Sequence, residues 1–158
     1  MPELSDLKPL DPAPDFSLPR DGGDNVSLSG LKGQTVVLFF YPRDNTPGCT
    51  RESTEFSERL QEFAEAGAQV FGISADSLAS HAKFTAKQGL TVALLSDENN
   101  AVCAAYGVWK EKNNYGRKYM GIERSTFVIG PDGRLAEIWR KVKVAGHVDA
   151  VLTAVKSL

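Results

Sequence analysis

Apolar residues gather in short, almost continuous runs at several places along the chain. Residues 35–41 are Thr-Val-Val-Leu-Phe-Phe-Tyr, stopped by Pro42, and residues 69–74 form a second such run. Short runs of β-branched, aromatic and aliphatic residues predict strands that are buried on both faces. Residues 92–95 predict a third strand, and residues 16–18 predict a short one that ends in a glycine-rich turn.

Between these runs, apolar residues recur with the spacing of one helix face. In residues 50–66 they fall at i, i+4, i+7 and i+8, and Gly67 is suited to end that helix. Residues 77–88, followed by Gly89, and residues 97–106 predict two further helices. A last helix has an apolar face that we expect to pack on a sheet, formed by Val148, Val151, Leu152 and Val155.

The C-terminal third changes character, because two strand-like runs follow each other directly. Residues 125–129 and 135–139 are joined by Gly-Pro-Asp-Gly-Arg, which predicts a hairpin. The early alternation of strands and helices predicts a parallel sheet with right-handed crossovers, to which the hairpin adds antiparallel strands. No repeat or linker interrupts the pattern, so we expect one α/β domain over residues 1–158.

Composition and charge exclude several classes of function. The chain has 158 residues and a net charge of −2, and its one basic cluster, residues 140–143, is interpreted as a solvated edge rather than a nucleic-acid site. No apolar run approaches the roughly 20 residues that span a bilayer. The first residues, Met-Pro-Glu-Leu-Ser-Asp, lack the features of a signal peptide. We therefore expect a cytoplasmic protein without nucleic-acid or membrane partners.

The two cysteines, Cys49 and Cys103, are too few for a disulfide scaffold. Cys49 ends a loop that leaves the carboxyl end of a buried strand and enters a helix, at the sheet edge where ligands bind in parallel sheets. A helix N-terminus favours negative charge, and therefore the nucleophilic thiolate. Thr46, three residues earlier, either hydrogen-bonds at this site or caps the helix.

The pattern Pro42-x-x-x-Thr46-x-x-Cys49 resembles the active-site signature of the peroxiredoxins. The longer run over residues 40–52 resembles the bacterioferritin comigratory protein, or peroxiredoxin Q, subfamily. Further segments match in the same order, and the resemblance covers nearly the whole chain: residues 13–18, 95–98, 106–109 and 121–127.

This resemblance implies a thioredoxin-like fold, with a central mixed sheet flanked by helices and an N-terminal extension. It implies a thioredoxin-dependent peroxidase that reduces hydrogen peroxide and organic hydroperoxides in antioxidant defence and needs no cofactor. Cys49 is then the attacking thiolate, Thr46 and Pro42 shape the peroxide pocket, and Arg124 supports the thiolate. We expect Glu52 to hold Arg124 by a bidentate pair. The alternatives are that Arg124 is a surface charge and Cys49 an inert buried thiol.

The sequence departs from the subfamily at the second cysteine. Attack on peroxide leaves a sulfenic acid, which a second thiol commonly converts to a disulfide. The two positions where the subfamily carries this resolving cysteine hold Thr54 and Thr85 here. Cys103 is the remaining candidate, although it is also interpreted as a small residue packed beside a helix. Our working hypothesis is one-cysteine chemistry in a monomer, with thioredoxin or another external thiol as the reductant.

Other functions are less well supported by these residues. A thiol–disulfide oxidoreductase of the same fold needs Cys-x-x-Cys, and Thr46 stands at the first position. His81 and His147 have no metal-ligand spacing, so we expect surface histidines and no metal site. A redox sensor or holdase that uses oxidised Cys49 as a switch stays open as an additional role.

Overall fold

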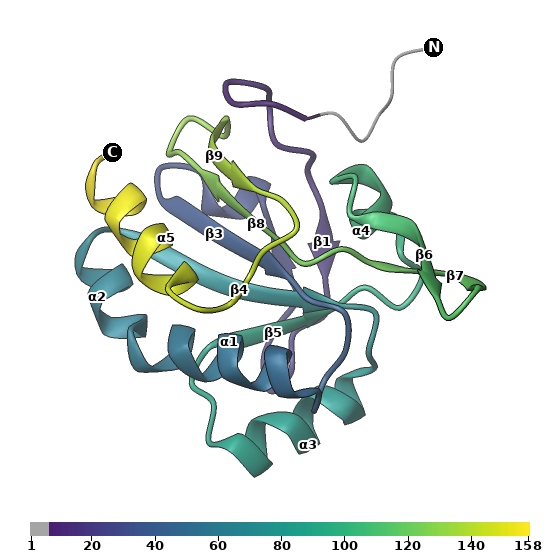
Figure 1. The fold of residues 1–158 in the computed structure, drawn as a ribbon. Helices are drawn as coiled ribbons and strands as arrows, with labels where there is room; N and C mark the ends of the chain where they lie inside the picture. Colours follow the sequence, from purple (N-terminus) through teal and green to yellow (C-terminus); the bar gives the residue numbers. More distant parts are fainter. Residues whose placement is uncertain (1–6) are drawn as a thin grey trace.

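The computed structural model describes residues 7–158 and is built on a five-stranded mixed sheet (Figure 1). Residues 1–6, at the start of the expected N-terminal extension, lie outside the described residues. The strand order is β5-β4-β3-β8-β9, parallel among the first three strands and antiparallel from β3 onward. The strands are β3 (Thr35–Phe40), β4 (Ala68–Ser74), β5 (Ala93–Ser96), β8 (Ser125–Ile129) and β9 (Leu135–Trp139). The predicted parallel strands and the added hairpin are both confirmed.

Helices and two small ribbons surround this sheet. The helices are α1 (Pro47–Glu58), α2 (Leu60–Glu65), α3 (Leu78–Gln88), α4 (Ala101–Ala105), α5 (His147–Lys156) and the 3-10 turn η1 (Ser29–Leu31). The ribbons are β1 (Ser17–Leu18) with β2 (Val26–Ser27), and β6 (Trp109–Asn114) with β7 (Arg117–Ile122). No helix within residues 7–158 is long and apolar enough to cross a membrane.

The sheet separates two apolar cores, because successive side chains of a strand point to opposite faces. Val37 and Phe39 of β3 belong to the core under α1, α2, α3 and α5. Val36 and Leu38 belong to the core covered by the N-terminal segment, α4 and the base of the β6–β7 ribbon. This separation determines where the two cysteines lie.

The helix predicted over residues 50–66 begins earlier and is interrupted. It starts at Pro47, whose missing N–H suits the first helical position, and it breaks at Arg59, where φ is −102°. The helix predicted over residues 97–106 is shorter, because the Asp97 carboxylate accepts hydrogen bonds from the backbone N–H groups of Val102 and Cys103 at 3.3 and 2.7 Å.

Two expectations about basic residues need correction. In the cluster over residues 140–143, Lys141 and Lys143 are exposed as expected, but Arg140 is half-buried: it donates to the carbonyl oxygen of Gly107 at 3.3 Å, and its Cζ lies 5.4 Å from the centre of the Phe127 ring. His81 and His147 are buried rather than on the surface. Both rings are tied into the interior by hydrogen bonds, which offset the cost of burying their polar atoms.

Candidate active site

Cys49 is the third residue of α1 and its side chain is completely buried. Thr46 precedes the helix in an extended conformation, and its carbonyl oxygen accepts from the N–H of Thr50 at 2.8 Å. The N–H groups of Gly48 and Cys49 therefore have no acceptor within the helix. The sulfur lies at the positive end of the helix dipole, beside free backbone donors.

Arg124 bridges two acidic groups of this helix. Its Nη2 donates to Cys49 Sγ at 3.3 Å, and its Nη1 donates to Glu52 Oε1 at 2.7 Å. Gly48 allows this approach, since a Cβ there would lie 3.1 Å from Nη2. Burial lowers the pKa of Arg124, but the nearby Glu52 and Cys49 outweigh it and raise the pKa above its ordinary value. The guanidinium is therefore a permanent cation against the sulfur.

Glu52 holds Arg124 through one oxygen, not through the bidentate pair that we expected. Its Oε2 is buried and has no hydrogen-bond partner among the described residues. Burial raises the pKa of Glu52 to about 7, although the charge and hydrogen bond of Arg124 act in the opposite direction. The carboxyl group consequently exchanges a proton near neutral pH.

Thr46 and Pro42 flank the site without contacting the sulfur through a hydrogen bond in the described chain. The Thr46 hydroxyl donates to the carbonyl oxygen of Arg43 at 2.9 Å and makes no capping bond, so the capping interpretation is wrong. This bond organises the loop internally and leaves the lone pairs of the hydroxyl oxygen free to accept. Pro42 is half-buried and is the second residue after β3.

Lys112 is a second cation near Cys49 that sequence analysis missed. It is half-buried on β6, and burial together with the charge of Arg124 lowers its pKa, while the charges of Cys49 and Glu123 oppose this. The polar β6–β7 ribbon carries no apolar run, so it was not predicted. The feature of the sequence that could have indicated the ribbon is Gly116, which suits the two-residue hairpin turn at Tyr115 and Gly116. In the structure φ is positive at both residues, 54° and 77°.

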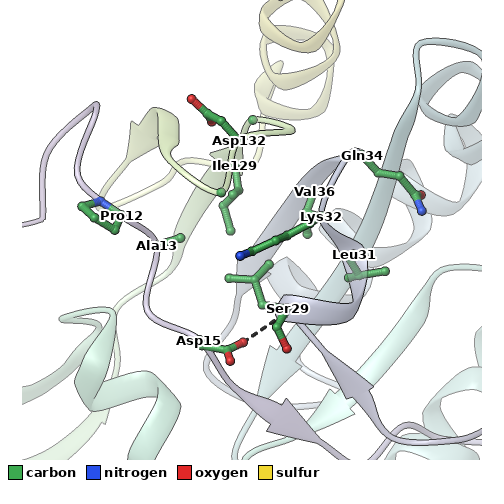
Figure 2. A pocket seen from close by; sticks show the side chains of 13 residues that line it. Pro12, Ala13, Asp15, Ser29, Leu31, Lys32, Gln34, Val36, Ile129 and Asp132 are labelled. Atoms are coloured by element: carbon green, nitrogen blue, oxygen red, sulfur yellow. Dashed lines mark hydrogen bonds between the residues drawn. The ribbon is translucent and has the colours of Figure 1, made fainter.

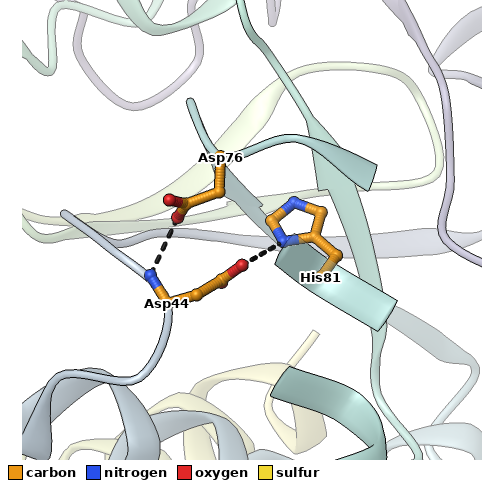
Figure 3. Close-up of side chains that lie close together, drawn as sticks. All are labelled: Asp44, Asp76 and His81. Atoms are coloured by element: carbon orange, nitrogen blue, oxygen red, sulfur yellow. Dashed lines mark hydrogen bonds and ion pairs between the residues drawn. The ribbon is translucent and has the colours of Figure 1, made fainter. Parts of the chain in front are cut away.

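Asp44, in the loop before Cys49, is the centre of a buried polar network (Figure 3). Tyr41 Oη donates to its Oδ1 at 2.6 Å, while Ser80 Oγ and His81 Nδ1 contact its Oδ2 at 2.8 and 2.7 Å. Its backbone N–H donates to Asp76 Oδ2 at 2.8 Å. The other ring nitrogen of His81 faces the Leu95 carbonyl oxygen at 2.9 Å.

Asp44, Asp76 and His81 are close enough together to raise the question of a metal ion. Both ring nitrogens of His81 face oxygen acceptors, so both carry protons and neither has a lone pair for a metal. The arrangement is that of a hydrogen-bonded ion pair.

Comparisons with known proteins agree with this geometry. Residues 9–138 match the AhpC/TSA family. Peroxiredoxin Bcp of Xanthomonas campestris pv. campestris is 51% identical over 148 residues, which is 92% of each chain. The chain belongs to the AhpC/TSA family of peroxiredoxins.

Solved structures of relatives have the same fold over almost the whole chain. Xylella fastidiosa PrxQ superimposes with a TM-score of 0.91 at 43% identity, covering 97% of this chain and 98% of that one. The bacterioferritin comigratory protein of Xanthomonas campestris gives a TM-score of 0.86 at 46% identity, with 97% and 98% covered. The predicted thioredoxin-like fold and subfamily are confirmed.

Cys103 lies in a different environment from Cys49 in this peroxiredoxin. It belongs to the core on the opposite face of the sheet from Cys49. Burial, together with the hydrogen bond and charge of Asp97, raises the pKa of its thiol. The sheet between the two sulfur atoms prevents a disulfide in this conformation, because a disulfide requires Cα atoms within about 7 Å.

A cavity of about 270 Å³ lies away from this peroxiredoxin site (Figure 2). It is lined by residues near the start of β3 and the end of β8, among them Val36 and Ile129, together with the N-terminal segment at Pro12. Cys49 follows the opposite end of β3, so this cavity lies away from Cys49.

Proposed function

We propose that Cys49 is the attacking thiolate of this thiol-dependent peroxidase and that Arg124 is the cation that supports it. The contact of Arg124 Nη2 with Cys49 Sγ at 3.3 Å carries the proposal. A guanidinium in this place stabilises the thiolate and polarises the O–O bond of a bound peroxide. Thr46 and Pro42 bound the space that the peroxide enters.

The first step transfers one oxygen atom to sulfur. The thiolate attacks the hydroxyl oxygen of ROOH, an S–O bond forms and the O–O bond breaks. The departing alkoxide, or hydroxide when R is hydrogen, takes a proton and becomes an alcohol or water. Cys49 is oxidised to a sulfenic acid and the peroxide is reduced. Negative charge on the departing oxygen is stabilised by Arg124 and by the free N–H groups of the first turn of α1.

The second step uses a thiol from another molecule. That thiol attacks the sulfenic sulfur, water leaves, and a mixed disulfide forms. A second external thiol then releases Cys49 as a thiol and leaves the reductant as a disulfide. The opposite placement of Cys103 across the sheet supports this route over an internal disulfide. Thioredoxin, a dithiol protein, fits this role.

Hydrogen peroxide and organic hydroperoxides are the proposed substrates. The Xanthomonas campestris relative is described by its alkyl peroxide reduction activity, which supports the organic hydroperoxides as substrates. Two free thiols suit a reducing compartment, which supports a cytoplasmic enzyme. We further propose that the chain acts as a monomer of one domain.

Peroxide consumption in the presence of thioredoxin, its reductase and a hydride donor tests the proposal. The wild type and Cys103→Ser should both turn over many equivalents of peroxide, and Cys49→Ser should consume none above background. If the wild type stops after about one equivalent per thiol, it is a sensor and not an enzyme. If Cys103→Ser loses turnover while its first oxidation persists, Cys103 resolves Cys49 and the one-cysteine proposal fails.

A further inference from the structure

The loop over residues 42–46, between β3 and α1, is attached to the rest of the fold through one residue, Asp44, by its side chain and its backbone N–H. Within the described chain, every hydrogen bond that joins this loop to an element other than α1 involves Asp44. The Thr46 hydroxyl bond to Arg43 stays inside the loop. The position of the segment that leads into Cys49 therefore depends on what holds Asp44.

One of the partners that hold the Asp44 carboxylate is a charged histidine, His81. His81 Nδ1 lies 2.7 Å from Asp44 Oδ2, and Nε2 lies 2.9 Å from the Leu95 carbonyl oxygen. A carbonyl oxygen and an ionised carboxylate only accept hydrogen bonds, so both ring nitrogens must donate and the ring is an imidazolium. The side chains of His81 and Asp44 are 0% and 1% exposed, so solvent screens their attraction little.

The fully buried state of Cys49 creates a need for movement. A peroxide is small, whereas a protein thiol has to bring its own sulfur into contact with Cys49, which is 0% exposed. The segment in front of Cys49 must open for that contact. Opening moves Asp44 with the loop, while His81 stays on α3 and Tyr41 on the end of β3.

We propose that the Asp44–His81 ion pair is a latch that holds the loop before Cys49 closed, so that His81 controls how often Cys49 becomes accessible to a protein thiol. His81 is a positioning residue, because it acts through Asp44 and does not touch the sulfur. The consequence for recycling Cys49 rests on the proposed function, whereas the latch itself is a property of the fold.

The latch is sensitive to pH in a definite direction. Burial lowers the pKa of His81, but the hydrogen bond and charge of Asp44, the Leu95 carbonyl and the charge of Asp76 outweigh it and raise the pKa above 6.5. The groups that face the ring are Asp44 from the loop, Asp76 from the segment after β4, and Tyr41. Burial and the charge of Asp44 raise the pKa of Tyr41, so its hydroxyl stays a neutral donor. Stability from the pair is thus fully present below pH 6.5 and is lost as pH rises through the raised pKa of His81.

Amide hydrogen exchange of the peptide that spans residues 41–50, followed by mass spectrometry, measures the latch without any redox chemistry. In His81→Gln the side chain keeps one donor but loses the charge and cannot reach both acceptors. We expect the exchange of this peptide to accelerate about tenfold, while peptides from β8 keep their protection. Ser80→Ala, which removes one neutral hydrogen bond to Asp44, should have a smaller effect.

Exchange measured at several pH values, together with control variants, separates the latch from a general loss of stability. After correction for intrinsic exchange, the wild type should approach His81→Gln as pH rises, and His81→Gln should show no such change. His147→Gln, the same substitution at the other buried histidine, should leave the loop peptide unchanged. If His81→Gln fails to fold, Asp44→Asn replaces it and should accelerate loop exchange to the same extent.

Three results would overturn the latch. They are loop exchange in the variant equal to wild type, acceleration spread evenly over all peptides, or a wild-type pH dependence that persists in His81→Gln. The reactions of Cys49 with a bulky maleimide and with the smaller iodoacetamide add a test of access. Dividing the maleimide rate by the iodoacetamide rate cancels the reactivity of the thiolate itself. This ratio should rise in His81→Gln, and an unchanged ratio would contradict the latch. A failure of peroxide turnover would overturn the proposed function and leave these results standing.

Discussion

The two cysteines are equally buried, and their surroundings are electrostatically opposite. Cys49 lies at the start of α1 with the Arg124 guanidinium 3.3 Å from its sulfur. Cys103 lies across the sheet beside the Asp97 carboxylate, which together with burial raises the pKa of its thiol. Both side chains have a relative exposure of 0%. Burial therefore does not distinguish the two cysteines, whereas the sign of the neighbouring charge does, and this difference supports the proposed role of Cys49.

The two sides also differ in how their buried polar groups are paired. Arg124 donates hydrogen bonds to both Cys49 and Glu52, and Glu52 Oε2 is buried without a hydrogen-bond partner among the described residues. On the Cys103 side, the Asp97 carboxylate is used twice by backbone N–H groups of α4. A buried oxygen without a hydrogen-bond partner among the described residues also lies at the start of α4, Asn100 Oδ1, so an unpaired oxygen does not distinguish the two sides.

Removing the cation from the Cys49 side should have the largest effect. Arg124→Gln should slow the second-order reaction of Cys49 with peroxide by about 10²–10³-fold, because a preorganised charge at a reacting centre contributes that much. Arg124→Lys keeps the charge but cannot bridge Cys49 and Glu52, so its rate should fall between that of the wild type and that of Arg124→Gln. Stopped-flow tryptophan fluorescence measures the step. Arg134→Lys, at the opposite end of the molecule, is the matched control, and a rate for Arg124→Gln equal to that control would contradict the role of Arg124.

Removing the buried negative charge should stabilise the protein at alkaline pH. Because the pKa of Glu52 rises from 4.5 to about 7 in the folded protein, folding binds a proton there, and stability falls as pH rises between these values. Glu52→Gln lacks this fall, so it should be more stable than wild type by about 3 kcal/mol near pH 8 and similar near pH 5. Urea unfolding at the two pH values measures the difference.

Glu55→Gln provides the control for this effect. Glu55 lies on the same helix and pairs with the exposed Arg51, so its loss should change stability by less than about 0.5 kcal/mol at either pH. If Glu52→Gln is destabilised equally at both pH values, Glu52 is a simple ion-pair partner and its carboxyl group does not exchange a proton near neutrality.

The second cation on the Cys49 side should have the smallest effect. Lys112→Met should slow the peroxide step by about two- to fivefold, because a half-exposed charge contributes only about 0.5–1 kcal/mol. The difference from wild type should shrink in high salt. Lys118→Met, on the same ribbon but 70% exposed, should react like wild type. Equal rates for both variants would remove Lys112 from the site.

Most of the sheet could be predicted from the sequence, because its strands are buried on both faces and therefore appear as apolar runs. β3, β4, β5 and β8 are such cases, and β9, which is only partly buried, was predicted from its apolar residues and the turn that joins it to β8. The β6–β7 ribbon could not be predicted, since its exposed strands carry lysine, glutamate and asparagine without alternation. Lys112 was missed together with the ribbon.

The site was predictable only where its residues share a motif. Cys49, Thr46 and Glu52 lie within one loop and helix, and the family resemblance adds Arg124. Asp44 and His81 are 37 residues apart and belong to no common pattern, so their pairing follows only from the packing of α3 against the loop. A lone histidine in the sequence gives no sign of whether its two nitrogens will find acceptors.

The contrast between the two cysteines is tested most directly by intact mass after one equivalent of hydrogen peroxide. Wild type and Cys103→Ser should both gain one oxygen atom, dimedone should trap it at Cys49, and Cys103 should stay a free thiol in the wild type. A wild-type protein that instead loses two hydrogen atoms through an internal disulfide, absent in Cys103→Ser, would contradict the account, because the two thiols would then meet across the sheet.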